Sequence, residues 1–268
     1  MKFSVFVVTL NSGSELADTL ASILAQENAD FEIIIKDGLS TDGSLSLIPT
    51  DPRIRTISQK DSGIYNGMNQ VIDYATGDFG IFMNCGDSFH NTSVLYKLEK
   101  EIEKSGFKNR DVIFYGDCFF ESRGYCIHYP DEFDDYVCFT TTLCHQATVY
   151  AMALLRERKF QEKYRHAADF EYYVQAYKNG TPIVHLPVII ANYKGNGVSE
   201  VNAANRKKTL SEFKDAMKQH FSKADYRKVW CKAQLHGVGI KRFLIQQDFF
   251  YPVYRTFARV YYKIKNQQ

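Results

Sequence analysis

The 268-residue sequence lacks the long apolar runs and cysteine patterns typical of membrane-spanning or disulfide-bonded proteins. No run approaches 18 consecutive apolar residues, so we expect no transmembrane helix. The apolar run near the start, FSVFVV, is too short for a signal peptide. The six cysteines form neither a CxxC pair nor a zinc-binding spacing, which favours reduced thiols and a cytoplasmic protein.

Two common nucleotide-binding signatures are also missing. The first apolar run is not followed by GxGxxG, and GxxxxGK[ST] occurs nowhere in the chain. These absences disfavour a dinucleotide-dependent oxidoreductase and a P-loop nucleotide hydrolase. A bound diphosphate would then have to be neutralised in another way, most simply by a divalent metal ion.

The chain has little net charge, only +2, but the two signs are unevenly distributed. Residues 203–268 contain 15 Lys and Arg against 4 Asp and Glu, a net charge of +11, which leaves −9 for residues 1–202. The basic part is rich in aromatic residues and is expected to be helical. Two interpretations stay open: a surface that lies on anionic lipid, or a helical cap or oligomer interface. No nucleic-acid-binding motif is present.

The apolar runs predict an α/β protein. Four runs of strand length alternate with amphipathic helical segments, at 3–10, 31–38, 54–58 and 78–87. Strands that are apolar throughout are typical of a parallel sheet covered on both faces. Further elements are expected as a strand at 112–117, a hairpin around Arg123-Gly124, a strand within 140–151, a helix at 166–180 and a strand at 182–193. Pro187 places that last strand at an edge or a bend.

Polar residues follow the early strands where those strands end. They are Thr9 and Asn11, then Asp37, then Asn84 and Asp87. Because ligands bind at the carboxyl ends of parallel strands, these endings suggest one composite site. Asp37 would hold a ribose or a base edge, or would only shape the DGLSTDG turn. Asp87 is the best hard-oxygen metal ligand, with a turn or helix-capping role as the alternative.

Four segments in this order and spacing carry a family resemblance: IIIKDGLSTDGS, QKDSGIYNGMNQVIDYATGDFGIFMNCGD, LCHQATVY and HAADFEYYV. Over about residues 1–195 the sequence resembles the family 2 glycosyltransferases, in the bacterial branch that makes lipopolysaccharide and capsular polysaccharide. The resemblance implies a GT-A fold, which is Rossmann-like, with a mainly parallel central sheet. It also implies a nucleotide-sugar donor, a divalent cation and inversion at the anomeric carbon. The expected division is a catalytic domain at 1–200 and a helical C-terminal extension at 201–268.

The resemblance also assigns residues to the donor site. It places Thr9, Asn11 and Asp37 at the nucleoside and lets Asp61 and Asn69 line the same site. A neighbouring lysine, Lys60, is expected to be a solvated loop residue.

The remaining assignments concern the metal and the chemistry. Many family members carry DxD where this chain reads Asn84-Cys85-Gly86-Asp87, so Mn²⁺ or Mg²⁺ would depend on Asp87 with phosphate and water as other ligands. The resemblance makes Asp169 the catalytic base; the alternative is an ordinary acid in the first turn of a helix. His145 is either an acceptor-side or phosphate contact or a structural histidine.

The resulting expectation is an inverting glycosyltransferase of hexosyltransferase type. It would move a sugar from a nucleotide-diphosphate donor, UDP-sugars being favoured, to a glycan or lipid-linked acceptor in bacterial surface polysaccharide synthesis. It would be cytoplasmic, with contact to the inner face of the plasma membrane if the basic segment lies on lipid. The alternative is a nucleotide-binding scaffold on the same fold with a decayed active site, suggested by the missing carboxylate of DxD.

Overall fold

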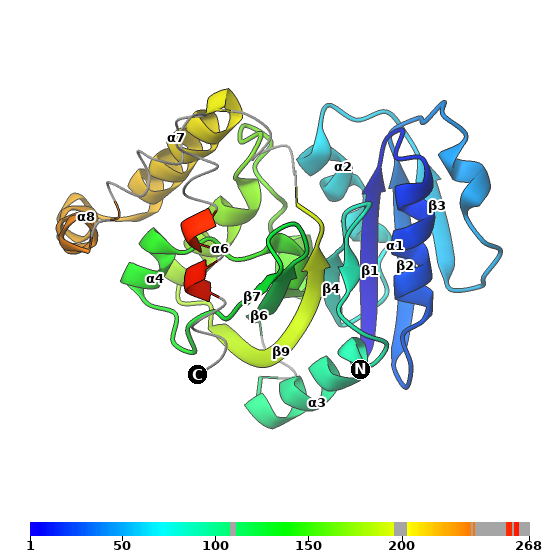
Figure 1. Cartoon of the computed structure of the whole chain (residues 1–268), viewed down its shortest axis with the longest axis horizontal. Coiled ribbons are helices and arrows are strands. Elements are labelled where there is room, and N and C mark those ends of the chain that lie inside the picture. The colour runs from blue at the N-terminus through cyan, green and yellow to red at the C-terminus, as the bar shows by residue number, and fades with distance from the viewer. Residues whose placement is uncertain (108–110, 196–202, 237, 239–255, 259, 263–268) are drawn as a thin grey trace.

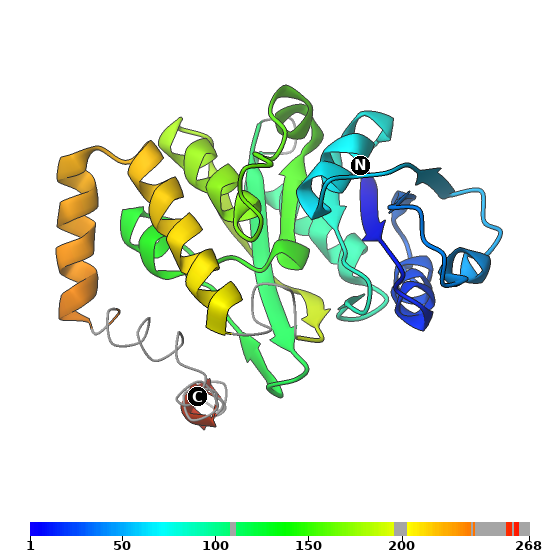
Figure 2. The ribbon, with the colours of Figure 1, turned by 90° about the horizontal axis from the view of Figure 1, so that it is seen from above.

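A computed structural model describes residues 1–107, 111–195, 203–236, 238, 256–258 and 260–262. Its first half is a parallel sheet in the order β3-β2-β1-β4. The strands are β1 (Lys2–Thr9), β2 (Asp30–Asp37), β3 (Ile54–Ser58) and β4 (Phe79–Phe82). Helices α1 (Ser14–Leu24) and α2 (Ile64–Val71) lie on opposite sides of β1 (Figure 2). Five successive residues of β1 are buried because both faces of the strand are covered.

The second half of the sheet is mixed. Its strands are β5 (Ser88–Phe89), β6 (Ile113–Phe120), β7 (Tyr125–Ile127), β8 (Thr148–Ala151) and β9 (Ile183–Tyr193). The order continues β4-β8-β6-β9-β5, and β7 pairs with β6. Antiparallel β8 lies between β4 and β6, so the predicted parallel arrangement holds for the first four strands and for the pair β6 and β9.

Two strand predictions meet different outcomes. The segment 78–87 is not one strand: β4 ends at Phe82, a turn follows, and β5 begins at Ser88. The bend expected at Pro187 is confirmed. The pairing of β6 with β9 shifts register between Tyr115 and Asp117, so β9 bulges around the proline, which has no N–H to donate.

Helices and short 3₁₀ turns make up further elements of the described residues (Figure 1). The remaining α-helices are α3 (Val94–Ser105), α4 (Asp135–Thr140), α5 (Met152–Glu157), α6 (Ala168–Lys178), α7 (Ala203–His220) and α8 (Lys223–Leu235). The 3₁₀ turns are η1 (Ser44–Leu47), η2 (Ile72–Tyr74) and η3 (His145–Ala147). Helices α4, α6, α7 and α8 gather at the end of the molecule away from β1, β2 and β3.

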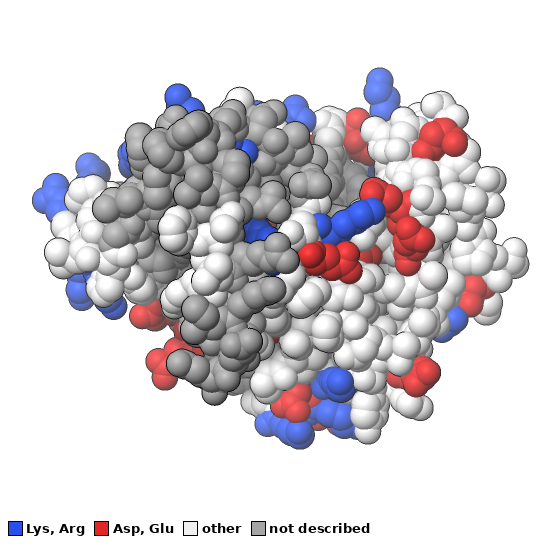
Figure 3. All heavy atoms as spheres, in the orientation of Figure 1, with Lys and Arg blue, Asp and Glu red and all other residues white. Residues whose placement is uncertain are grey.

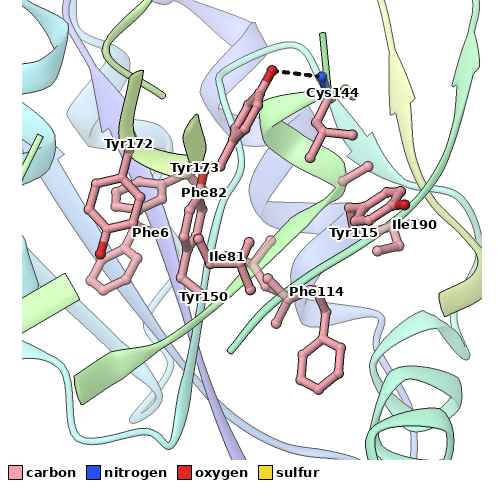
Figure 4. Close-up of a cluster of buried hydrophobic side chains, with 14 of the residues drawn as sticks. Phe6, Ile81, Phe82, Phe114, Tyr115, Cys144, Tyr150, Tyr172, Tyr173 and Ile190 are labelled. Atoms are coloured by element: carbon pink, nitrogen blue, oxygen red, sulfur yellow. Dashed lines mark hydrogen bonds between the residues drawn. The ribbon is translucent and has the colours of Figure 1, made fainter. Parts of the chain in front are cut away.

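Aromatic side chains fill the core between the two halves of the sheet (Figure 4). Phe82 of β4 stacks on Phe6 of β1 with ring centroids 4.7 Å apart. It also meets Tyr150 of β8 and Phe160 in edge-on contacts. These buried aromatic residues therefore belong to the core and fix the position of β8 against β4.

Candidate active site

The loops that follow β1 and β2 are fastened to each other. The side-chain oxygen of Asn11 accepts a 2.8 Å hydrogen bond from the Thr41 amide, and the Asn11 amide donates to the Ser40 hydroxyl at 2.9 Å. Asn11 holds a φ of 51°, a left-handed conformation that asparagine tolerates better than most residues. The two strand ends thus form one wall of the expected nucleoside site.

Asp37, at the end of β2, is almost fully buried and shapes the loop after it. Its two oxygens accept hydrogen bonds from the amides of Leu39, at 3.2 Å, and Ser40, at 3.0 Å. Burial works to raise the pKa of Asp37, but these bonds and those from the Ser40 and Ser58 hydroxyls outweigh it and lower the pKa. The turn-forming alternative is therefore what the structure shows directly, and any ligand contact would come in addition.

Thr9 is also buried, and its hydroxyl shares a 2.7 Å hydrogen bond with Ser12. Asp61 pairs with Lys36, a buried lysine of β2. Lys36 Nζ lies 2.7 Å from Asp61 Oδ2 and also donates to the carbonyls of Asp37 and Gln59. Lys36 was not singled out from the sequence, because it falls inside an apolar strand pattern.

Asn69 of α2 has its side chain committed to another part of the chain. It donates to the Phe160 carbonyl at 2.9 Å and accepts from the Phe160 amide at 2.8 Å. It also donates to Glu162 Oε1 at 3.2 Å. This pairing holds the segment before α6 against α2, so the structure shows a positioning contact where the resemblance implied a donor-site residue.

The turn between β4 and β5 carries the residues that replace DxD. Gly86 has a φ of 90°, which a residue with a Cβ adopts only under strain. Thr19 of α1 holds the turn: its hydroxyl accepts from the Gly86 amide at 2.9 Å and donates to the Asp87 carbonyl at 2.8 Å. This turn presents the Asp87 carboxylate at the carboxyl end of the parallel strands.

The Asp87 carboxylate is buried between two hydrogen-bond donors. Gln146 Nε2 donates to Oδ2 at 2.5 Å, and the Lys194 amide donates to Oδ1 at 2.9 Å. Burial raises the pKa of Asp87 to about 6, the two hydrogen bonds oppose that rise, and the charges of Glu121 and Glu15 add to it. A buried carboxylate with acidic neighbours is an environment that a cation would stabilise.

The two carboxylate oxygens of Asp87 fit a magnesium or manganese ion that is held by few protein ligands. Each Asp87 oxygen accepts one hydrogen bond and keeps a further lone pair. Over the described residues, no group of three or more His, Cys, Asp or Glu side chains is arranged to hold a metal. The remaining ligands would have to be substrate phosphates and water, an arrangement that Mg²⁺ accepts readily.

Asp169 lies in the first turn of α6, partly exposed and in contact with two other side chains. The Tyr65 hydroxyl donates to Asp169 Oδ1 at 2.8 Å, and His145 Nδ1 lies 3.8 Å from Oδ2. Burial first, and then the Asp169 charge, raise the pKa of Tyr65 well above its ordinary value, so the phenol keeps its proton and acts as a donor. One carboxylate oxygen is thus fixed by Tyr65, and the other is available to take a proton.

His145 is an uncharged neighbour of that carboxylate at neutral pH. Burial lowers the pKa of His145, against a smaller raising effect of Asp169. Its ring stacks on Phe82 at 5.2 Å, and Nδ1 also lies 3.3 Å from the Tyr150 hydroxyl. Nε2 is buried with no hydrogen-bond partner among the described residues. The stacking on Phe82 fits the structural interpretation of His145, and the unpartnered Nε2 leaves an atom that a ligand could bind.

The turn η3 contacts both candidate carboxylates. Because β8 runs antiparallel to β4, the residues just before β8 lie beside the residues just after β4. Within η3, His145 faces Asp169 while Gln146 binds Asp87. Sequence reasoning singled out His145 and both carboxylates but passed over Gln146 and Tyr65, although each stood inside a quoted motif, CHQ and GIYNGMN.

Comparison with known proteins gives the class. The profile of "Glycosyl transferase family 2" matches residues 4–124. A "PGL/p-HBAD biosynthesis glycosyltransferase" of Mycobacterium tuberculosis is 29% identical over 203 residues, covering 73% of this chain and 77% of that protein. The "Putative teichuronic acid biosynthesis glycosyltransferase TuaG" of Bacillus subtilis is 24% identical over 263 residues, covering 89% and 96%.

Solved structures share the fold. S. aureus TarS 1–349 in complex with UDP-GlcNAc superimposes with a TM-score of 0.67 at 20% identity, covering 85% of this chain and 70% of that chain. The mannosyltransferase PcManGT from Pyrobaculum calidifontis, in complex with GDP-Man and Mn²⁺, gives 0.66 at 16% identity, covering 87% and 69%. This chain spans 42% of the longer S. aureus TarS chain.

The predicted GT-A fold is confirmed by these neighbours, with a mixed sheet in its second half. The family 2 match at residues 4–124 falls within the predicted resemblance over about residues 1–195. With the named relatives, this match makes the chain a glycosyltransferase enzyme rather than an oxidoreductase.

Proposed function

We propose that this chain is an inverting glycosyltransferase. It would move a sugar from a nucleotide-diphosphate donor, UDP-sugars being favoured, to a glycan or lipid-linked acceptor in bacterial surface polysaccharide synthesis. The observation that carries the proposal is that two successive residues of η3 contact the two candidate carboxylates, His145 contacting Asp169 and Gln146 contacting Asp87. The relatives named for glycolipid and teichuronic acid biosynthesis support the acceptor class.

The residues divide the reaction between them. Asp169 takes the proton of the acceptor hydroxyl as the acceptor oxygen bonds to the anomeric carbon. The bond from that carbon to the diphosphate oxygen breaks on the opposite face, which inverts the configuration, and the nucleoside diphosphate leaves. Asp87 would hold the divalent metal ion, which when bound stabilises the negative charge of the departing diphosphate. The wall formed by Thr9, Asn11 and Asp37 would hold the nucleoside.

The C-terminal helices support membrane contact as part of this function. Of the residues in 203–236, 9 are Lys or Arg and 3 are Asp or Glu. In α8, Arg227 and Trp230 are exposed and three residues apart, hence on one face, and Leu235 is exposed beyond them. Figure 3 shows Lys and Arg side chains at the end of the molecule where Figure 1 places α7 and α8. Cations beside an exposed tryptophan suit the headgroup region of anionic lipid.

Membrane contact here means adsorption to a surface. Within the described part of the chain, no helix combines the length and the apolar character needed to cross a bilayer. Residues 239–255, which held much of the predicted aromatic tail, lie outside the described residues.

The deciding experiment compares the wild-type chain with Asp169→Asn. Nucleoside diphosphate release from a panel of UDP- and GDP-sugars should fall by roughly 10²- to 10⁴-fold in the variant, because a positioned base contributes about that much. UDP binding measured by calorimetry with Mn²⁺ should stay unchanged. An undiminished rate in the variant would contradict the mechanism. UDP binding by a wild-type chain that turns over no donor would instead support the scaffold alternative.

A further inference from the structure

Helix α7 is bonded to the segment that carries Asp169, although it lies in the part of the chain that the sequence set apart as an extension. The rings of Phe213 in α7 and Phe170 in α6 have centroids 4.3 Å apart. His220 Nε2, at the end of α7, lies 2.6 Å from the fully buried Glu171 of α6. Helix α7 therefore packs on the same helix whose first turn holds the proposed base.

The most specific of these contacts is made by Glu212. One oxygen of Glu212 accepts from the Arg165 amide at 3.1 Å, and the other accepts from the His166 amide at 2.8 Å. These two amides belong to the loop that leads into α6. The N-cap residue of α6, Ala167, provides no side-chain hydrogen bond. A carboxylate from α7 thus holds the two amides just before the N-cap residue, at a helix start that has no side-chain cap of its own.

The same loop is tied to α2 by the side chain of Arg165. Its Nη1 donates to the Ser62 carbonyl at 2.6 Å. The guanidinium lies so close to Gly63 that a Cβ there would come within 2.9 Å of Nη1, and Gly63 has a φ of +147°. Three residues after Ser62, Tyr65 donates its hydrogen bond to Asp169. Glu212 of α7 thus contacts the loop before α6, and Arg165 of that loop contacts Ser62 just before α2. Tyr65 of α2 in turn contacts the carboxylate in α6.

We propose that Glu212 is a positioning residue for the Asp169 carboxylate and acts through the Arg165 loop. This proposal deepens the proposed function and rests on it. Glu212 holds two successive amides, so it fixes both the direction in which α6 begins and the place from which Arg165 reaches Ser62. Asp169 follows the Arg165 loop in α6, and Tyr65 follows Ser62 in α2, so the contact between Arg165 and Ser62 positions both. A base displaced by even 1 Å from the acceptor hydroxyl costs on the order of 100-fold in rate.

The substitution Glu212→Gln tests this with little change in volume. Glutamine offers one acceptor oxygen and turns an NH₂ group toward the second amide, so one of the two hydrogen bonds is lost and replaced by a contact between two donors. We expect the kcat for donor turnover to fall by roughly 10- to 100-fold while the donor KM stays within about twofold, since the donor wall lies on other loops.

A neighbouring residue provides the matched control. Asp215 is on α7 as well, and its carboxylate accepts from the Tyr164 hydroxyl at 2.7 Å instead of from the backbone before α6. Asp215→Asn removes the same charge from the same helix and should leave kcat within about twofold. An equal loss of kcat in Asp215→Asn and Glu212→Gln would mean that α7 matters only through its docking, and would overturn the proposal.

A double-mutant cycle of Glu212→Gln with Tyr65→Phe tests whether the two residues act on the same carboxylate or independently of each other. If Glu212 and Tyr65 act on the same carboxylate, the combined loss of kcat should be clearly smaller than the product of the two single losses. A full product would contradict the proposal. The outcome with Asp169→Asn stands apart: an active Asp169→Asn refutes the proposed function, whereas an inactive Asp169→Asn beside a fully active Glu212→Gln refutes only the role of Glu212.

Discussion

The hydroxyl of Tyr65 donates a 2.8 Å hydrogen bond to Oδ1 of Asp169, a residue 104 positions away in the sequence. The bond joins the start of α2 to the start of α6 and leaves Oδ2 of the carboxylate facing His145. It therefore gives the proposed base a fixed orientation before any acceptor arrives.

Removing this hydroxyl should slow the reaction without weakening donor binding. In Tyr65→Phe we expect kcat to fall roughly tenfold or more, because a hydrogen bond to a charged group contributes about 1.5–3 kcal/mol. The donor KM should not change. Steady-state kinetics beside Tyr115→Phe provide the check, since Tyr115 is also a buried tyrosine and its hydroxyl donates to the Pro130 carbonyl instead. Equal kcat values for the two variants would show that Tyr65 has no special role.

Gln146 should control how tightly the proposed metal ion is held by Asp87. Gln146→Leu keeps the volume but removes the donor to Asp87 Oδ2, so the Mn²⁺ concentration needed for half-maximal activity should rise about 10- to 100-fold. The rate at saturating Mn²⁺ should recover to near the wild-type value. Gln161→Leu is the comparison, because Gln161 binds Glu171 instead. An unchanged Mn²⁺ requirement in Gln146→Leu would argue against Asp87 as the ligand.

A cluster away from the proposed site should make stability depend on pH. His185 lies 3.1 Å from Asp117 and 2.8 Å from Asp131. Burial opposes the charge on His185, but the hydrogen bonds to the two carboxylates outweigh burial and raise the pKa of His185. Burial also opposes the charge on Asp117, yet its hydrogen bonds, from His185 first and then from the Tyr129 amide and His128, lower the pKa of Asp117.

The sign of the effect follows from these directions. The His185 contribution is complete below the ordinary histidine value of about 6.5 and is lost as pH rises through the raised pKa. The Asp117 contribution is complete above about pH 4 and is lost as pH falls through the lowered pKa. Thermal melts should therefore show the largest advantage of wild type over His185→Gln between about pH 4 and 6.5, and a smaller one at pH 9. A pH-independent difference would contradict this. His90→Gln is the control, because His90 pairs with the uncharged Asn192.

The α8 surface should bind anionic vesicles. The wild-type chain is expected to sediment with phosphatidylglycerol vesicles and not with pure phosphatidylcholine. Changing Lys223, Arg227 and Lys228 together to Ser should weaken binding by roughly 100-fold, since each basic residue near the surface contributes about 1 kcal/mol. The pair Lys97→Ser and Lys104→Ser, on α3, should have no comparable effect. Equal sedimentation with both lipids would refute an electrostatic surface.

The sequence by itself determined the parallel half of the sheet. The strand at 54–58 was predicted with its true bounds, and the bulge at Pro187 followed from a missing N–H. Local periodicity determines such elements because a strand covered on both faces needs an apolar run and little else. It failed where the pattern was not local. Apolar Met83 seemed to extend β4, and the strand correctly predicted within 140–151 gave no sign that it runs antiparallel between β4 and β6.

The motifs also singled out Asp87, Asp169 and His145 as candidates, but only the tertiary structure decided which side chains they contact. It assigned Asp37 to its own loop and Asn69 to the Phe160 backbone, and it placed Gln146 and Tyr65 on the two carboxylates. The bonds of Glu212 to the loop before α6 join a segment that charge alone had set apart. Such contacts depend on the directions of side chains across distant elements, and sequence spacing records those directions only within one helix or strand.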